Sequence, residues 1–231
     1  MSLSNNLAHI QEKIETACKK ANRPSESVQL IAVSKTFPVQ DVQALAQIGH
    51  VDFAENRIAE LNKKIPETQI YPSLRWHLIG TLQSNKIKDL PDALFLFHAL
   101  DRLSLAEKLN AHMLQNDKSI QVLLQVNASR EINKSGFRPE DLLSVYETAI
   151  RYPALKICGL MTMAENTTDA AKIGNTFREV FELNEKLKNQ NLSPHYHGWL
   201  SMGMSHDFEI AIQEGATHIR IGSLLFGKRG I

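Results

Sequence analysis

The stretch Val28-Gln-Leu-Ile-Ala-Val-Ser-Lys-Thr-Phe-Pro38 is an apolar strand that delivers a lysine, Lys35, at its carboxyl end. A lysine that ends a buried parallel strand is costly unless its amine is solvated, paired or made neutral, and an imine with a carbonyl ligand does the last. The alternative is a solvated loop lysine. Taken alone, the stretch favours this alternative, because strand-end lysines are common and perturbed lysines are rare.

Strands alternate with helices along the rest of the chain. Apolar runs predict strands at residues 28–35, 50–55, 74–80, 93–100, 120–127, 155–163, 196–202 and 217–226. Helical spacing and end signals predict helices at residues 5–21, 38–49, 57–64, 84–90, 103–116, 139–152, 170–189 and 207–214. This alternation indicates a parallel sheet whose crossovers cover it.

About eight such strands close a (β/α)8 TIM-type barrel, to which the helix at residues 5–21 is an addition. The alternative is a doubly wound open sheet, but no Gly-x-Gly-x-x-Gly follows the first strand. No linker-like stretch breaks the alternation. We therefore expect an α/β protein with one barrel domain over residues 1–231.

Bulk properties point to a small-molecule binder. The chain has 231 residues, 43% of them hydrophobic, and a formal net charge of +1. The chain lacks the basic excess that a nucleic-acid-binding protein would have. We expect neither a leader nor a bilayer-spanning stretch, and therefore no membrane partner. Cys18 and Cys158 lie far apart in the sequence, and we interpret them as ordinary thiols of a protein in a reducing compartment. The expected location is the cytoplasm.

Two loops after the last strands have the composition of a phosphate cradle. They read Ser201-Met-Gly-Met-Ser205 and Arg220-Ile-Gly-Ser223. Glycine lets backbone amides approach an anion, and serine hydroxyls add donors. Barrel enzymes commonly bind phosphate after their last two strands. A turn with a helix cap explains either loop alone, but two on adjacent strands favour phosphate binding.

Arg220 lies inside or at the end of the final strand, where it needs an acceptor. A buried ion pair with Glu55 or another carboxylate is one explanation. A ligand is the other, because an imine-forming lysine, a phosphate cradle and an inward arginine together suit a phosphorylated aldehyde with a ring nitrogen. Pyridoxal 5'-phosphate is such a ligand. His195 and His197 lack a third ligand at suitable spacing, so no metal site is expected.

Motifs along nearly the whole chain also carry a family resemblance. In order, they are Ala32-Val-Ser-Lys-Thr36, Phe53-Ala-Glu-Asn-Arg57, Trp76-His-Leu-Ile-Gly-Thr-Leu-Gln-Ser-Asn-Lys86, Lys134-Ser-Gly136, Gly159-Leu-Met-Thr-Met163, Leu200-Ser-Met-Gly-Met-Ser205 and Arg220-Ile-Gly-Ser223. Together they resemble the pyridoxal phosphate homeostasis protein family. The resemblance implies a barrel similar to the N-terminal domain of alanine racemase, with the cofactor held as a Schiff base on Lys35.

Site residues follow from the resemblance by matching motif. Ser201, Gly222 and Ser223 would hold the phosphate. Arg220 would face the ring nitrogen of the cofactor, and Asn56 would lie beside the cofactor.

One departure from the family pattern is His206, which stands where an acidic or small residue is more usual. Beside a phosphate it could add a pH-dependent charge. Lys228 and Arg229 form a solvated tail that could also attract the phosphate.

The resemblance implies a binding role in vitamin B6 homeostasis, without an established catalytic turnover. Related racemases take a second acid/base group from a further domain, for which we expect no room before Ile231. An arginine opposite the ring nitrogen also makes the cofactor a weaker electron sink than an aspartate does. The alternatives are a racemase-like enzyme of low activity and a barrel enzyme with another phosphorylated ligand. A monomer is expected, with cofactor-dependent apoenzymes as candidate partners.

Overall fold

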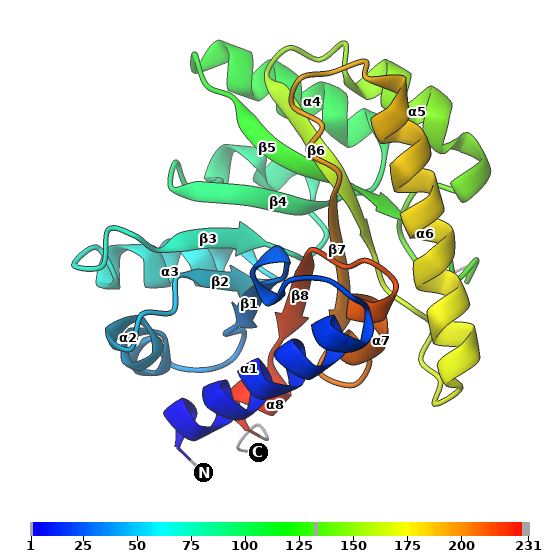
Figure 1. Ribbon diagram of the computed structural model, residues 1–231. Coiled ribbons are helices and arrows are strands. Elements are labelled where there is room, and N and C mark those ends of the chain that lie inside the picture. Colours follow the sequence, from blue (N-terminus) through cyan, green and yellow to red (C-terminus); the bar gives the residue numbers. More distant parts are fainter. Residues whose placement is uncertain (1, 132–133, 228–231) are drawn as a thin grey trace.

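A closed parallel barrel forms the centre of the molecule (Figure 1). The computed structural model describes residues 2–131 and 134–227, so Lys228 and Arg229 lie outside the described residues. The strands of the described chain are β1 (Gln29–Val33), β2 (Asp52–Glu55), β3 (Arg75–Leu78), β4 (Leu94–Leu100), β5 (Ile120–Val126), β6 (Leu155–Thr162), β7 (Trp199–Met204) and β8 (His218–Ile221).

The strands pair in chain order, and β8 pairs with β1 to close the barrel. In that last pairing Ile31 lies opposite Arg220, and Ala32 lies opposite Ile221. Each pairing is parallel, so the carboxyl ends of the strands and the loops after them gather at one end of the barrel. The predicted (β/α)8 TIM-type barrel is confirmed.

Helices surround the barrel on its outer side. They are α1 (Leu3–Lys20), α2 (Val39–Gln47), α3 (Ile58–Glu67), α4 (Leu103–Gln115), α5 (Leu142–Ala149), α6 (Ala170–Gln190), α7 (Phe208–Gln213) and α8 (Ser223–Phe226), with short 3-10 turns η1 (Ser25–Ser27), η2 (Ser84–Asp89) and η3 (Pro139–Asp141). The crossover between β3 and β4 therefore contains only a 3-10 helix where the sequence predicted a helix at residues 84–90.

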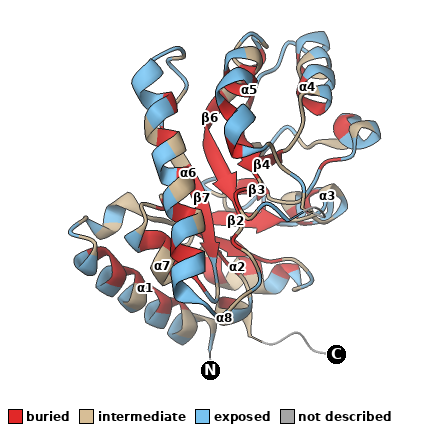
Figure 2. Ribbon diagram, turned by 90° about the vertical axis from the view of Figure 1, so that its right-hand side faces the viewer, coloured by how far each residue is buried: buried red, intermediate tan, exposed pale blue. Residues whose placement is uncertain are grey.

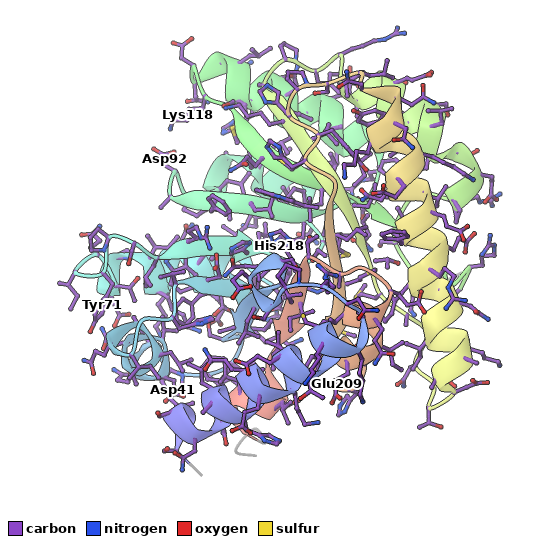
Figure 3. All side chains as sticks on the ribbon, viewed as in Figure 1. Asp41, Tyr71, Asp92, Lys118, Glu209 and His218 are labelled. Carbon is purple, nitrogen blue, oxygen red and sulfur yellow. The ribbon has the colours of Figure 1, made fainter. Side chains whose placement is uncertain are left out.

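The added N-terminal helix packs beside β8, against α7 and α8 (Figure 1). Its buried face contains Leu7, Ile10 and Ile14, which are spaced as one stripe of a helix. Beside this face Lys13 forms an ion pair across 2.7 Å with Glu209 of α7, which is labelled in Figure 3. The predicted N-terminal helix is thus confirmed, and it covers the seam at which the barrel closes.

The last predicted strand, residues 217–226, is wrong in its second half. β8 ends at Ile221, Gly222 precedes α8, and the apolar run Ser223–Phe226 is helical. Short apolar runs do not separate strand from helix by periodicity, because both can be buried on every side. The consequence is that Gly222 and Ser223 lie in the turn between a strand and a helix.

The strands of the barrel and the inner faces of the helices are buried (Figure 2), and the buried apolar residues form two clusters. The larger cluster lies between the barrel and its helices. The smaller cluster consists of Ile31, Val33 and Ala54, with Ile79 packed against them. Within residues 2–131 and 134–227 no helix is long and apolar enough to cross a membrane.

Candidate functional site

A cavity of about 280 Å³ opens at the carboxyl ends of the strands. It is lined by Val33, Lys35, Phe37, Asn56, Ile79, Met161, Met163, Met204, Ser205, His206, Arg220, Gly222, Ser223 and Gly227. These residues come from β1, β2, β3, β6, β7 and β8 or from the segments that follow them. This end of the barrel is where barrel proteins place their functional groups.

Lys35 reaches the cavity from a tight turn directly after β1. The backbone N–H of Phe37 donates to the carbonyl of Ser34 across 3.0 Å, which places Lys35 and Thr36 in the middle of the turn. Thr36 has φ 70°, in the left-handed region that β-branched residues rarely adopt. The ring of Phe37 stacks on Phe226 of α8 with centroids 4.9 Å apart. The turn thereby fixes where the lysine side chain begins.

Glu55, at the end of β2, pairs with a lysine and not with Arg220. Its Oε1 accepts from Nζ of Lys64 at 2.6 Å and from the hydroxyl of Ser34 at 2.6 Å. Burial raises the pKa of the Glu55 carboxyl, although the hydrogen bonds from Lys64 and Ser34 oppose that rise. The ion pair considered for Arg220 with Glu55 is therefore wrong.

Arg220 lies on β8, is 4% exposed and lines the cavity. One terminal nitrogen donates to the hydroxyl of Ser201 at 2.6 Å, and the other donates to the carbonyl of Thr162 at 3.0 Å. A guanidinium has five N–H groups, so these two acceptors leave donors for the cavity. Burial lowers the pKa of Arg220 to about 10, and the charge of Asp207 opposes this shift. Arg220 is still a cation at neutral pH.

A chain of buried hydrogen bonds continues from Arg220 through the barrel interior. Ser201 Oγ lies 2.8 Å from Nδ1 of His98, and Nε2 of His98 lies 2.9 Å from Nδ1 of His77. Nε2 of His77 lies 3.0 Å from a carboxylate oxygen of Asp52. The chain joins the cavity to the amino end of the barrel, where Asp52 begins β2.

The groups at the two ends of this chain of hydrogen bonds determine which side chain is the donor in every bond of it. Arg220 can only donate, so Ser201 accepts from it and has its own proton for His98. At the other end the Asp52 carboxylate can only accept, so His77 carries its proton on Nε2 and accepts from His98 on Nδ1. Both arguments give the same tautomers, with His77 and His98 neutral.

The pKa shifts agree with neutral histidines. Burial lowers the pKa of His77, although Asp52 opposes the shift, and burial lowers the pKa of His98 well below its usual range. Burial also lowers the pKa of His218, on β8, to about 3. Burial works to raise the pKa of Asp52, but hydrogen bonds from His77 and Arg75 outweigh it and hold that pKa low. The charge therefore sits on Asp52.

The β7 and β8 loops lie together, as the sequence predicted, but Ser201 is not in either of them. It is a fully buried residue inside β7, and its hydroxyl is engaged by Arg220 and His98. It does not line the cavity, whereas Ser205 does. The strand predicted at residues 196–202 overlapped the predicted loop Ser201–Ser205, and β7 in fact continues to Met204, so the loop begins later than the sequence indicated.

Contacts between the two loops bring the predicted donors together. The N–H of Leu224 donates to the hydroxyl of Ser205 at 3.4 Å, and Ser223 and Gly222 line the cavity beside it. Gly203 has φ 91°, and a Cβ there would lie 2.6 Å from Cβ of Ala211. Glycine is thus needed for α7 to pack under this loop.

The remaining predicted residues also reach this end of the barrel. Asn56 follows β2 and lines the cavity. His206 is exposed at the rim, next to Ser205, and it lines a second hollow that extends toward α6. The structure thus brings Lys35, Asn56, Arg220 and both loops to one cavity. Ser201 does not line this cavity and is linked to it through its hydrogen bond with Arg220.

Sequence reasoning missed His98 and Lys64. His98 stands alone in the apolar strand β4, and Lys64 stands among the polar residues of α3, so neither has a local signal. His77, by contrast, belongs to the Trp76–Lys86 motif and is a fully buried, packed histidine. Only the closure of the barrel, which brings β3, β4 and β7 to one interior, could have linked these side chains.

Comparisons with known proteins agree with this geometry. A family model described as alanine racemase, N-terminal domain, matches residues 5–230. An alanine racemase from Clostridium difficile superposes with a TM-score of 0.74 at 16% identity, covering 99% of this chain and 57% of that one. That likeness shows the fold, so the class of protein is a barrel of the alanine racemase N-terminal type.

Closer relatives narrow the class. Pyridoxal phosphate homeostasis proteins of Aquifex aeolicus and Haemophilus influenzae are 38% and 40% identical, each covering 99% of this chain and 99% and 97% of their own lengths. PipY of Synechococcus elongatus, solved with PLP bound, superposes with a TM-score of 0.83 at 32% identity, covering 98% of this chain and all of that one. This chain belongs to the pyridoxal phosphate homeostasis protein family.

Proposed function

We propose that this chain binds pyridoxal 5'-phosphate (PLP) on Lys35 and takes part in PLP homeostasis, with residues 1–231 acting as one domain. The observation that carries the proposal is that Lys35 and Arg220 line one cavity from the neighbouring strands β1 and β8. The PLP-bound structure of PipY, a relative of 32% identity, supports the same ligand.

The donor set fits each part of this ligand. A primary amine suits the aldehyde: the neutral amine of Lys35 adds to its carbon, and loss of one water leaves a C=N bond, a Schiff base. For the phosphate we propose Gly222, Ser223 and Ser205, whose hydroxyls and backbone N–H groups lie at the cavity. Ser201 acts indirectly, through Arg220.

Arg220 and Asn56 complete the proposed site. The guanidinium of Arg220, held by Ser201 and Thr162, would face the ring nitrogen. Asn56 would lie beside the ring. PLP supplies an electron sink when bound, and a cation near the ring nitrogen weakens that sink by disfavouring its protonation.

We propose a binding role without catalytic turnover, and the make-up of the cavity supports it. Among the described residues that line the cavity, the titratable side chains are Lys35, His206 and Arg220. Arg220 stays protonated at neutral pH, and His206 is exposed at the rim. The names of the relatives from Aquifex aeolicus and Haemophilus influenzae also describe homeostasis and not a reaction. A racemase-like enzyme of low activity is the competing proposal, with His206 as the second proton carrier.

The setting of the protein is part of the proposal. We propose that the protein is a monomer and that it is cytoplasmic. Cys18 and Cys158, which are free and buried as in proteins of reducing compartments, support the proposed location. Its partners would be PLP and PLP-dependent apoenzymes, with neither nucleic acid nor membrane involved. Size-exclusion chromatography with light scattering tests the monomer.

The decisive experiment is covalent trapping. Purified protein incubated with PLP is expected to develop a near-visible absorption band, and borohydride is expected to fix the cofactor to the peptide that contains Lys35. Lys35→Ala should abolish the band. Lys13→Ala, at a half-buried lysine paired with Glu209, should retain it. Absence of the band from the parent protein, or full covalent occupancy in Lys35→Ala, contradicts the proposal.

The competing proposal is tested on the same preparation. Single enantiomers of several amino acids are incubated with the PLP-loaded protein and followed by chiral chromatography. We expect no racemisation at enzyme-like rates. Such rates, together with their loss in His206→Ala, would favour the racemase.

A further inference from the structure

A buried ion pair lies directly beneath the turn that contains Lys35. Nζ of Lys64, on α3, lies 2.6 Å from Oε1 of Glu55 at the end of β2. The two side chains are only 3% and 0% exposed. The second carboxylate oxygen of Glu55 is buried with no hydrogen-bond partner among the described residues.

Stability alone does not account for this pair. Removing two charges from water carries a large desolvation penalty, and apolar side chains of similar volume often stabilise a protein as well or better. The unsatisfied oxygen of Glu55 adds a further cost. Fixing one conformation is the best attested use of a buried polar group, so the question is what the pair holds in place.

The pair holds Ser34. The carbonyl of Ser34 accepts from Nζ of Lys64 at 2.8 Å, and its hydroxyl donates to Oε1 of Glu55 at 2.6 Å. Its N–H donates to the carbonyl of Ala54 at 3.0 Å. Each polar group of this residue thus has a partner, and three of those bonds reach β2 or α3.

Ser34 is also the first residue of the turn. Its carbonyl accepts from the N–H of Phe37 as well as from Lys64, with Lys35 and Thr36 in between. The left-handed conformation of Thr36 is unfavourable for a residue with a β-branched side chain. Such a backbone persists only where the surroundings over-determine it. The ion pair beneath Ser34 supplies that constraint.

We propose that Glu55 and Lys64 are positioning residues that hold the Ser34–Phe37 turn in the one conformation that presents the Lys35 amine to the aldehyde of PLP. The inference rests on the proposed role of Lys35. It assigns to the pair an effect on imine formation that is separate from binding of the ring and the phosphate, because neither Glu55 nor Lys64 lines the cavity.

The test compares two ligands on one variant. Glu55→Gln with Lys64→Met removes both charges together, so no lone charge stays buried. PLP reports imine formation, whereas 4'-deoxypyridoxine 5'-phosphate has the same ring and phosphate without the aldehyde. Asn184→Ala is the matched control, since Asn184 is a buried polar residue that bonds Tyr196 and Gly198 and does not line the cavity.

The expected result is a loss of at least tenfold in PLP affinity in the double variant, with less than a twofold change for the deoxy analogue. Asn184→Ala should lower thermal stability and leave the ratio of the two affinities unchanged. Parallel losses for both ligands, or no loss for PLP, would overturn the inference. If the double variant does not fold, Ser34→Ala removes one bond of the cluster and is expected to lower only PLP affinity, by about threefold.

A readout without cofactor separates this inference from the proposed function. Trace acetylation of the unliganded protein, followed by mass spectrometry, gives the reactivity of Lys35 relative to that of Lys13. The double variant is expected to change this ratio at least threefold. A parent protein that forms no imine would refute the proposed function alone, whereas an unchanged acetylation ratio would refute the positioning role.

Discussion

The guanidinium of Arg220 donates to the hydroxyl of Ser201 across 2.6 Å, inside the barrel and one step behind the cavity. The hydroxyl in turn donates a hydrogen bond to Nδ1 of His98, 2.8 Å away. The Ser201 side chain therefore connects Arg220 to the neutral histidines His98 and His77. Among the described residues that line the cavity, Arg220 is the only arginine. The guanidinium of Arg220 has little freedom to rotate, because one terminal nitrogen donates to Ser201 and the other donates to Thr162.

Replacing this hydroxyl tests the contact. Ser201→Ala leaves an N–H of buried Arg220 without its acceptor and Nδ1 of His98 without its donor, so we expect the free energy of unfolding to fall by about 2–3 kcal/mol. Urea denaturation at neutral pH measures the change. Ser144→Ala, at an exposed serine that bonds only the backbone of Asp141, should stay within about 0.5 kcal/mol of the parent. An equally small effect at Ser201 would contradict the assigned chain.

Much of the fold could be predicted from the sequence because most strands are short apolar runs followed by a helix with a polar face. The residues after the strands then gather at one end whatever their exact boundaries, which is why Lys35 and Asn56 reach the same cavity. Boundaries themselves are decided by tertiary packing. That explains why Ser201 lies inside β7 and why the run after Gly222 is helical.

The interior of the barrel could not be predicted in the same way. His98 and Lys64 acquire partners only through distant strands and helices, namely Ser201, His77 and Glu55. Their sequence neighbours do not distinguish them from ordinary packed or solvated residues. Pairing between segments far apart in the chain, and not local pattern, gives these residues their roles.

Acid should destabilise the protein through its buried histidines. Burial lowers the pKa of His77, His98 and His218 in the folded state, so unfolding below about pH 6.5 is accompanied by proton uptake. Their neutral forms thus contribute stability that is present above about pH 6.5 and lost as the pH falls. Between pH 7 and 5 we expect a loss of about 2 kcal/mol from His218, whose pKa is lowered to about 3, and His98 and His77 add to this loss in the same direction.

Urea denaturation across this pH range measures the loss. His98→Asn is expected to reduce the pH slope by about one proton, roughly 1.4 kcal/mol per pH unit. The control is His9→Asn, because His9 is exposed on α1. A slope in His98→Asn equal to that of the parent would show that His98 takes up its proton in the folded state.

Gly80 controls the backbone of a site residue. A Cβ at this position would lie 2.1 Å from the carbonyl oxygen of Asn56, closer than any real contact. Gly80→Ala must therefore displace Asn56, and we expect stability to fall by about 2–3 kcal/mol and PLP affinity to fall with it. Thermal unfolding and titration with PLP measure both effects.

Gly174 offers the matched control for that substitution. It lies within α6, and a Cβ there would meet side-chain atoms at an ordinary 3.7 Å. Gly174→Ala is expected to raise stability by about 1 kcal/mol, because alanine favours the helix, and to leave PLP affinity unchanged. Gly80→Ala with parental PLP affinity would show that the position of the Asn56 backbone does not matter for the ligand.

Thr36 carries a strain that a different side chain would relieve. It is exposed and has φ 70°, a conformation that asparagine tolerates far better than threonine. Thr36→Asn is therefore expected to raise the free energy of unfolding by about 1 kcal/mol, measured by urea denaturation, whereas Thr16→Asn in α1 should give no gain. If PLP affinity stays parental, Ser34 and its ion pair set the turn. A large fall in PLP affinity would instead tie Thr36 itself to the presentation of Lys35.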